Sequence, residues 1–448
     1  MTTSLTRRDA LRLLVLASAS AALLAACGDE KPVPDGSAPG DAELGLVSSD
    51  LKRVPGDPGA VPDVVAAMAA FAGGLYGGLR EVPGNLVLSP YSVAVALGMT
   101  LNGAAGETAA QMRTALGLDE PGLDDLATDG FNQGMNALTA HIDSLAGPQR
   151  RADGSKAEIE LAVASALFGE QTMTWRQQFL DVLAQEYGAG LQTVDYLGAA
   201  EQARELINGW TSERTGERIP ELIPPGVLDA LTRLVLVNAL YLKAPWETPF
   251  EKTLTEPAPF LLVDGSTVDV DTMRAAPVEA QLSAGEGWRA ARLPYAGAKL
   301  AMTVVLPDEG AQEAVEAGLA RDGVAPYLAP GKPTGLDLRL PRWTFRSPSD
   351  LNPVLQGLGM RDAFAPPVAD FSAMTDAADL YVSAVLHEAF IAVDEEGTEA
   401  AAATAVIMSE TSAPVLEPFV VDRPFLFVIH DTAQATPLFL GRVADPRA

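Results

Sequence analysis

The sequence is poor in the side chains that build metal sites and catalytic triads. Its 448 residues include one cysteine, Cys27, and three histidines, His141, His387 and His430. A cluster of His and Cys ligands cannot be assembled, and a Ser-His-Asp triad must use one of these histidines. Neither a Gly-x-Ser-x-Gly elbow nor a G-x-x-x-x-G-K-[ST] phosphate loop occurs. We therefore expect no enzyme, no cofactor and no metal, and a hydrolase centred on His387 is the enzyme alternative.

Basic residues are scarce as well. The chain has 31 Lys and Arg against 59 Asp and Glu, a formal net charge of −28. Repulsion from phosphate groups then disfavours nucleic acid as a partner. The stretch from Gly397 to Val421 contains no Lys or Arg at all.

The first residues have the layout of an export signal. Arg7 and Arg8 precede an apolar run that is too short to span a bilayer and that ends at Cys27. Residues 6–11 are similar to a twin-arginine signal, and residues 24–27 resemble a lipobox, whose cysteine becomes the acylated first residue. An ordinary secretory signal with an accidental cysteine is the alternative. We expect a signal peptide at 1–26 and an exported lipoprotein, anchored through Cys27 in a membrane at the cell surface or facing the periplasm.

The remaining chain divides into a tether and one large folded unit. Residues 27–59 are rich in Gly, Pro, Asp and Ser and predict a flexible tether, whereas patterned segments fill residues 60–448. Helical periodicity dominates early and strand-like runs dominate later, which predicts an α+β fold. The clearest helices are expected at 92–102, 108–116 and 199–213, and the clearest strand at 300–306.

Four separated blocks of the chain, in order, resemble the serpin family of protease inhibitors. They are NLVLSPYS at 85–92 with GAAGETAAQ at 103–111; INGW at 207–210 with LVNALYLKAPW at 236–246; LPY at 293–295 with DFS at 370–372; and HEAF at 387–390 with DEEGTEAAAAT at 394–404, DRPF at 422–425 and LFLGRV at 438–443. The resemblance implies one domain with a central mixed β-sheet, additional sheets, surrounding helices and an exposed reactive-centre loop.

The resemblance also implies a mechanism. A protease cleaves the loop as a substrate, forms an acyl-enzyme, and is trapped when the freed loop enters the main sheet as a new strand. The hinge that enters first comprises Glu395, Gly397, Thr398, Glu399, Ala400, Ala401, Ala402, Ala403 and Thr404. Alternation along a strand puts Thr398, Ala400, Ala402 and Thr404 on one face and Glu399 on the other, so the inward face carries no charge. We expect the hinge to stay outside the sheet until cleavage, with Thr398 first to enter and Glu399 facing outward.

A polar cluster beneath the sheet is implied as well. Ser89, Ser92, Asn238 and His387 match the positions that hydrogen-bond under the middle of the main sheet and re-form when its strands part. A static buried polar network is the alternative, because buried polar groups are normally paired whatever their role.

The scissile bond has two candidates. Counting from Glu395 places it between Thr411 and Ser412, and Met408–Ser409 is the competing bond. Because no basic residue is present, an elastase-like or subtilisin-like serine protease is the expected partner, with a cysteine protease as a further possibility. We expect a monomer, and a non-inhibitory serpin that acts as a binding or chaperone-like surface protein remains the alternative function.

Overall fold

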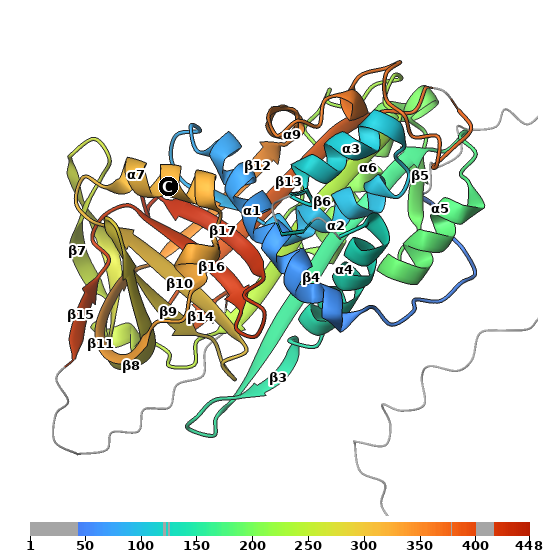
Figure 1. Cartoon of the computed structure of the whole chain (residues 1–448). Coiled ribbons are helices and arrows are strands. Elements are labelled where there is room, and N and C mark those ends of the chain that lie inside the picture. Colours follow the sequence, from blue (N-terminus) through green and yellow to red (C-terminus); the bar gives the residue numbers. More distant parts are fainter. Residues whose placement is uncertain (1–43, 120–121, 124–125, 378, 400–415) are drawn as a thin grey trace, which may run out of the picture. The chain divides into compact units, whose positions relative to one another are not determined.

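Two β-sheets organise the part of the chain that the computed structural model describes, residues 44–119, 122–123, 126–377, 379–399 and 416–448 (Figure 1). Within these residues the main sheet has 8 strands, ordered β1-β5-β4-β6-β14-β13-β12 with β3 paired to β4, and the second has 9, ordered β15-β11-β8-β9-β10-β16-β17-β2 with β7 paired to β8. The strands are β1 Gly45–Val47, β2 Leu86–Leu88, β3 Gly147–Arg150, β4 Lys156–Glu170, β5 Leu191–Val194, β6 Leu234–Pro245, β7 Glu256–Leu261, β8 Thr267–Gly285, β9 Trp288–Pro294, β10 Leu300–Pro307, β11 Lys332–Pro341, β12 Trp343–Asp350, β13 Val382–Val393, β14 Gly397–Thr398, β15 Glu417–Val420, β16 Phe425–Asp431 and β17 Pro437–Val443.

Helices cover both faces of the main sheet. They are α1 Val61–Leu79, α2 Pro90–Leu101, α3 Gly106–Ala115, α4 Thr128–Asp143, α5 Gln177–Val182, α6 Tyr196–Arg214, α7 Gln312–Asp322, α8 Ala325–Leu328 and α9 Asn352–Gly357, with short turns η1 Pro58–Ala60, η2 Leu183–Tyr187, η3 Lys252–Leu254 and η4 Asp362–Phe364. The expected helices and strand are confirmed as α2, α3, α6 and β10.

The strand β6 shows why this sheet is buried on both faces. Leu236 and Leu240 belong to the core shared with α2, whereas Val235 and Val237 pack with residues of α6. Side chains of a strand point alternately to its two faces, so a strand covered on both faces must be apolar throughout. The continuous apolar run of β6 follows from this position.

The segment before α1 belongs to the folded unit, which corrects the predicted boundary at residue 60. β1 pairs antiparallel with β5, Arg53 Nε donates to Asn136 Oδ1 at 2.7 Å, and Val54 N donates to Gln185 O at 2.9 Å. Gly56 lies so close to α4 that a Cβ would sit 2.3 Å from Gln133 O. The glycines and polar residues that suggested a tether are here fixed by backbone pairing and close approach, and we call residues 45–57 the strap.

One helical stretch of the described residues is long and apolar enough to cross a membrane. It is Pro58–Leu79, and 61% of its apolar window is buried inside the protein. Phe71, Leu75 and Tyr76 of α1 contribute to the core, so this stretch is a core helix.

Candidate functional site

The two central strands of the main sheet, β6 and β13, are paired along one part of their length and separated along the rest. Leu234 to Leu240 pair in parallel with Val382 to Ala389. Beyond this region β14 lies between them, with Gly397 opposite Pro245 and Thr398 opposite both Ala244 and Val393. The expectation that the hinge lies wholly outside the sheet is therefore wrong, because Gly397 and Thr398 are already part of it.

Local backbone chemistry explains why the hinge can occupy this position. Gly397 has a φ of 153°, and a Cβ on it would lie 2.2 Å from Ala244 O, so only glycine fits. Trp246 N donates to Glu396 O at 2.8 Å, and Glu399 N donates to Ala392 O at 2.9 Å. The backbone is thus bonded to the strands on both sides.

Two aromatic residues contact the hinge. Trp246 and Tyr295 stack with ring centroids 4.6 Å apart and planes 4° from parallel. The hydroxyls of Tyr295 and Thr398 are 2.7 Å apart, and Trp246 Nε1 donates to Asp394 O at 3.0 Å. Sequence reasoning did not assign these residues a role, although Trp246 and Tyr295 each end one of the quoted motif blocks.

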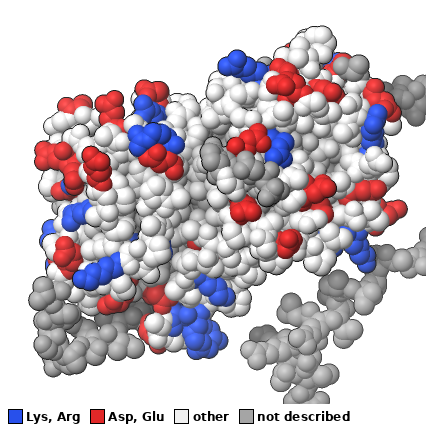
Figure 2. Space-filling model, viewed as in Figure 1, with Lys and Arg blue, Asp and Glu red and all other residues white. Residues whose placement is uncertain are grey.

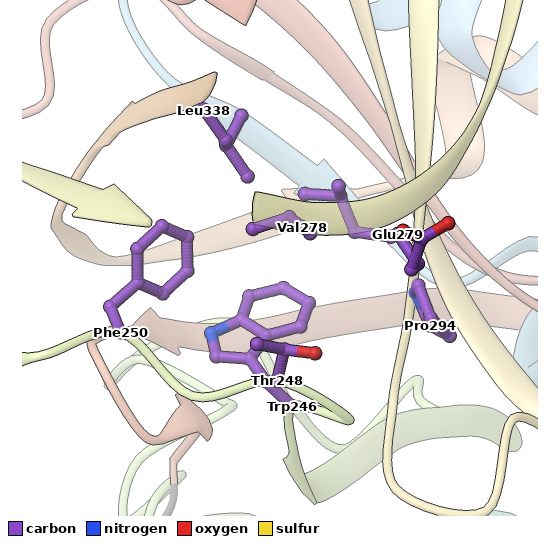
Figure 3. A pocket seen from close by; sticks show the side chains of 8 residues that line it. Trp246, Thr248, Phe250, Val278, Glu279, Pro294 and Leu338 are labelled. Atoms are coloured by element: carbon purple, nitrogen blue, oxygen red, sulfur yellow. The ribbon is translucent and has the colours of Figure 1, made fainter. Parts of the chain in front are cut away.

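Trp246 also borders a small cavity. Figure 3 shows Phe250, Val278 and Leu338 among the side chains that line it. Its volume is about 10 Å³. Such a space holds no more than about one water molecule, so it is not a site for a small-molecule ligand.

Carboxylates flank the inserted hinge, and each has a partner. Thr255 Oγ1 donates to Glu395 Oε1 at 2.7 Å, with Arg342 Nε 3.7 Å from Glu395 Oε2. Lys252 Nζ lies 3.4 Å from Glu396 Oε1. Asp394 Oδ1 accepts from the backbone of Glu396 at 2.9 Å, although burial raises the pKa of this carboxyl group. These partners allow acidic residues to lie next to the buried strand.

Glu399 lies on the opposite face from Thr398, but its side chain is not open to solvent. Its carboxylate forms an ion pair with Arg218, which follows α6, and the side chain is only 13% exposed. Burial raises the pKa of Glu399, while Arg218 opposes that shift. We expected Glu399 to lie on the face opposite Thr398. The sequence did not indicate that Arg218 covers Glu399, because Arg218 is 181 positions away in the chain.

The four predicted polar residues meet beneath the paired part of the sheet, and we call them the shutter cluster (Ser89, Ser92, Asn238, His387). Ser89 caps α2 by accepting from Ser92 N at 3.2 Å, and Ser89 N donates to His387 Nε2 at 3.0 Å. His387 Nδ1 then donates to Asn238 O at 3.2 Å. Among the described residues, neither side-chain atom Oδ1 nor Nδ2 of Asn238 has a hydrogen-bond partner, although Asn238 is fully buried.

The surroundings of His387 argue against a hydrolytic triad. Burial lowers the pKa of His387 to about 4, so the ring is neutral at pH 7. Both ring nitrogens are bonded to backbone groups, and the ring has no exposed surface. It is not placed to activate a serine hydroxyl for attack on a substrate.

The other predicted site residues fall outside the described part of the chain. These are Cys27, Ala400, Ala401, Ala402, Ala403, Thr404, Met408, Ser409, Thr411 and Ser412. In the described ranges no group of three or more His, Cys, Asp or Glu residues is placed to hold a metal ion.

A family model described as serpin (serine protease inhibitor) matches residues 66–446. The leukocyte elastase inhibitor of Bos taurus is 37% identical over 373 residues, covering 81% of this chain and 93% of that protein. Serpin B9 of Homo sapiens is 35% identical over 367 residues with the same coverage.

Solved structures agree in fold. The thermophilic serpin tengpin in its native state superposes with a TM-score of 0.79 at 27% identity, covering 90% of this chain and all of that one. Uncleaved ovalbumin gives a TM-score of 0.73 at 26% identity, covering 86% of this chain and all of the other.

Proposed function

The chain belongs to the serpin family, and from that premise we propose that it inhibits a serine protease by inserting its cleaved loop between β6 and β13. The observation that carries this proposal is β14, which already lies between these strands and pairs with both. A strand that continues from β14 would therefore have a defined position between β6 and β13.

The register of β14 supports a particular extent of insertion. With Thr398 opposite Ala244, a continued antiparallel strand brings Met408 opposite Leu234, the first residue of β6. On the other side, Thr398 opposite Val393 brings Ser409 opposite Val382, the first residue of β13. Both neighbours therefore accommodate a segment that ends at Met408 or Ser409.

The same register gives the shutter cluster a role in insertion. A continued strand places Thr404 opposite Asn238 on one side and opposite His387 on the other. Directly opposed side chains share a face, so the Thr404 hydroxyl comes to the Asn238 amide that lacks a partner in the closed sheet. A buried amide group without a partner costs about 1–3 kcal/mol, and insertion relieves this cost.

The target is a protease that accepts a small or medium apolar residue before the cut. The loop has no Lys or Arg from Gly397 to Val421, and relatives of the chain are named as leukocyte elastase inhibitors. Elastase-like and subtilisin-like enzymes meet this requirement, and a cysteine protease of similar preference is the second choice. Cleavage at Thr411–Ser412 leaves three residues beyond Met408 to link the acylated protease, whereas Met408–Ser409 leaves none.

The test is to incubate the chain without residues 1–27 with pancreatic elastase, a subtilisin and, as the mismatched control, trypsin. We expect an SDS-resistant complex with one of the first two and little or none with trypsin. Mass spectrometry of the released fragment identifies the bond, since the fragment begins at Ser412 or at Ser409. Cleavage without any complex, for every protease, would instead support a non-inhibitory serpin that acts by binding.

We also propose that the protein is an exported, lipid-anchored monomer, with Cys27 as the acylated residue. The lipobox-like residues 24–27 and the absence of any other cysteine support the lipid anchor. Cys27→Ala should move the protein from the membrane fraction to soluble or unprocessed forms, because acyl chains supply the membrane affinity. Unchanged membrane association after this substitution contradicts the proposal.

A further inference from the structure

The hairpin of β3 and β4 carries two exposed cations that have no acidic partner. Arg150 and Lys156 are directly opposite each other across the antiparallel pair and are both exposed. Like charges in that position repel and destabilise a hairpin. Neither side chain has a carboxylate within 4 Å in the described part of the chain, whereas fifteen other Lys and Arg residues there do.

None of the described acidic residues of the hairpin forms an ion pair with Arg150 or Lys156. Asp153, at the turn, accepts from Ser155 N at 2.7 Å. Glu158 is two residues along β4 from Lys156, on the same face, and Glu160 is paired with Lys243. Figure 2 shows basic side chains gathered at the lower edge of the molecule, where Figure 1 has the hairpin.

The hairpin is fixed to the segment that holds the hinge. Arg151 is buried and its Nε donates to Trp246 O at 2.7 Å, while Ala152 N donates to the Glu247 carboxylate at 2.5 Å. Trp246 in turn binds Glu396 through its backbone N–H. The two cations therefore have a fixed position relative to the point where the loop leaves the sheet.

The distance from this point is short. Glu160 pairs with Lys243, next to the Ala244 that lies opposite Thr398. Lys156 is four residues further along β4, roughly 13 Å at about 3.3 Å per residue. A protease domain of about 230 residues has a radius of gyration of about 17 Å, which is comparable with the separation between Lys156 and the hinge strand β14.

We propose that Arg150 and Lys156 form a secondary docking surface for an acidic patch on the target protease, next to its active site. This inference rests on the proposed function. It adds a second requirement to the sequence preference of the loop: the target protease carries carboxylates next to its active site. A complementary charge pair raises the rate of encounter and relieves the repulsion between the two cations. A long polyanion fits less well, because it needs a row of cations and meets an otherwise acidic surface here.

The experiment measures the second-order rate constant for loss of the intact chain, which counts complex formation and simple cleavage alike. The protease is whichever of pancreatic elastase or subtilisin cleaves the loop faster. The double variant Arg150→Gln with Lys156→Gln is compared with a control of equal charge change, Lys52→Gln with Arg361→Gln, two exposed cations outside the hairpin. We expect a rate about 3- to 10-fold lower for the hairpin variant at 25 mM NaCl, less than about 2-fold at 500 mM, and a nearly unchanged rate for the control.

A second arm changes the protease. Blocking its surface carboxylates with carbodiimide and ethanolamine, with the active sites titrated afterwards, should remove the difference in rate between wild type and the hairpin variant.

Equal rates for wild type and the hairpin variant, or equal losses of rate in the hairpin and control variants, overturn the docking surface. Binding of dextran sulfate to wild type but not to the variant, with no effect on protease rates, assigns the surface to polyanions and also overturns it. The fraction of lost chain that appears as SDS-resistant complex reports separately on the proposed function.

Discussion

The two ends of the seam between β6 and β13 differ in what stabilises them. At the end where β14 lies, aromatic stacking and partnered carboxylates surround the hinge. At the closed end, β6 and β13 pair directly, and the buried amide of Asn238 has no partner within the described residues. One buried polar group without a hydrogen-bond partner therefore lies where the new strand has yet to arrive, whereas Glu399 at the other end depends on its ion pair with Arg218. A protein can store free energy for a conformational change by leaving one buried group unsatisfied in its starting state.

The largest expected effect comes from filling the closed end. Limited cleavage of the loop should let residues up to Met408 pair on both sides. After the direct bonds between β6 and β13 that must break are subtracted, about 1 kcal/mol net per hydrogen bond leaves a gain on the order of 10 kcal/mol. Thermal melting before and after the nick should show a rise of roughly 10 °C or more. An ordinary surface loop gives the opposite sign, because a cut raises the entropy of the unfolded chain. A nicked form that melts at or below the intact form contradicts the insertion mechanism.

A charge at the open end should block the change. Thr398 is buried and bonded to Tyr295, so Thr398→Arg places an unpaired charge in the sheet, which costs about 3–5 kcal/mol. Insertion slows, the acyl-enzyme is hydrolysed first, and the stoichiometry of inhibition should rise about tenfold or more. Thr398→Ser keeps the hydroxyl and is the matched control. Equal stoichiometries of inhibition for Thr398→Arg and wild type contradict the insertion mechanism.

The closed end should also respond to acid. The pKa of His387 is lowered to about 4 in the fold, against about 6.5 for an unfolded histidine. As pH falls from 6.5 to 4, the unfolded chain binds the proton and the fold does not, so stability is lost by up to about 3 kcal/mol. The pKa of His430 is also lowered to about 4, so His430 likewise lowers the stability of the fold as pH falls. The pKa of Glu388 is raised to about 7, so the stability that this group contributes is lost as pH rises from 4.5 to 7.

The contribution of His387 is isolated by difference. Urea unfolding of wild type and His387→Gln at pH 7 and pH 4.5 should show the advantage of wild type shrinking toward the lower pH. Parallel profiles for the two proteins mean that His387 does not titrate in this way.

The smallest expected effect comes from Thr404, a hinge residue that insertion brings to the closed end of the seam. Thr404→Val keeps the shape but removes the hydroxyl that insertion brings to Asn238, so the stability gained on cleavage should fall by about 1–3 kcal/mol. The stability of the intact protein should not change, which makes the intact Thr404→Val protein its own control. A loss of the same size in the intact form places Thr404 in a contact of the uncleaved protein instead.

The sequence predicted the fold class and the four residues of the shutter cluster, because these depend on motif blocks that are local in the chain. It missed the strap, since backbone pairing of β1 to β5 uses no distinctive side chains. It also missed that Gly397 and Thr398 start inside the sheet. That state depends on Trp246, Tyr295 and Arg218, which are distant in sequence and meet the hinge only after folding.

The presence of β14 before any protease arrives has a kinetic consequence. Starting a strand between two others is a nucleation step, in which the backbone is ordered before contacts compensate the lost entropy. Here the first residues of the strand are already placed, so the proposed insertion continues residue by residue between β6 and β13 as their direct pairing opens. Whether the protease is trapped then depends on whether residues 400–408 insert before the acyl-enzyme is hydrolysed. The small alanine side chains in this segment favour fast insertion.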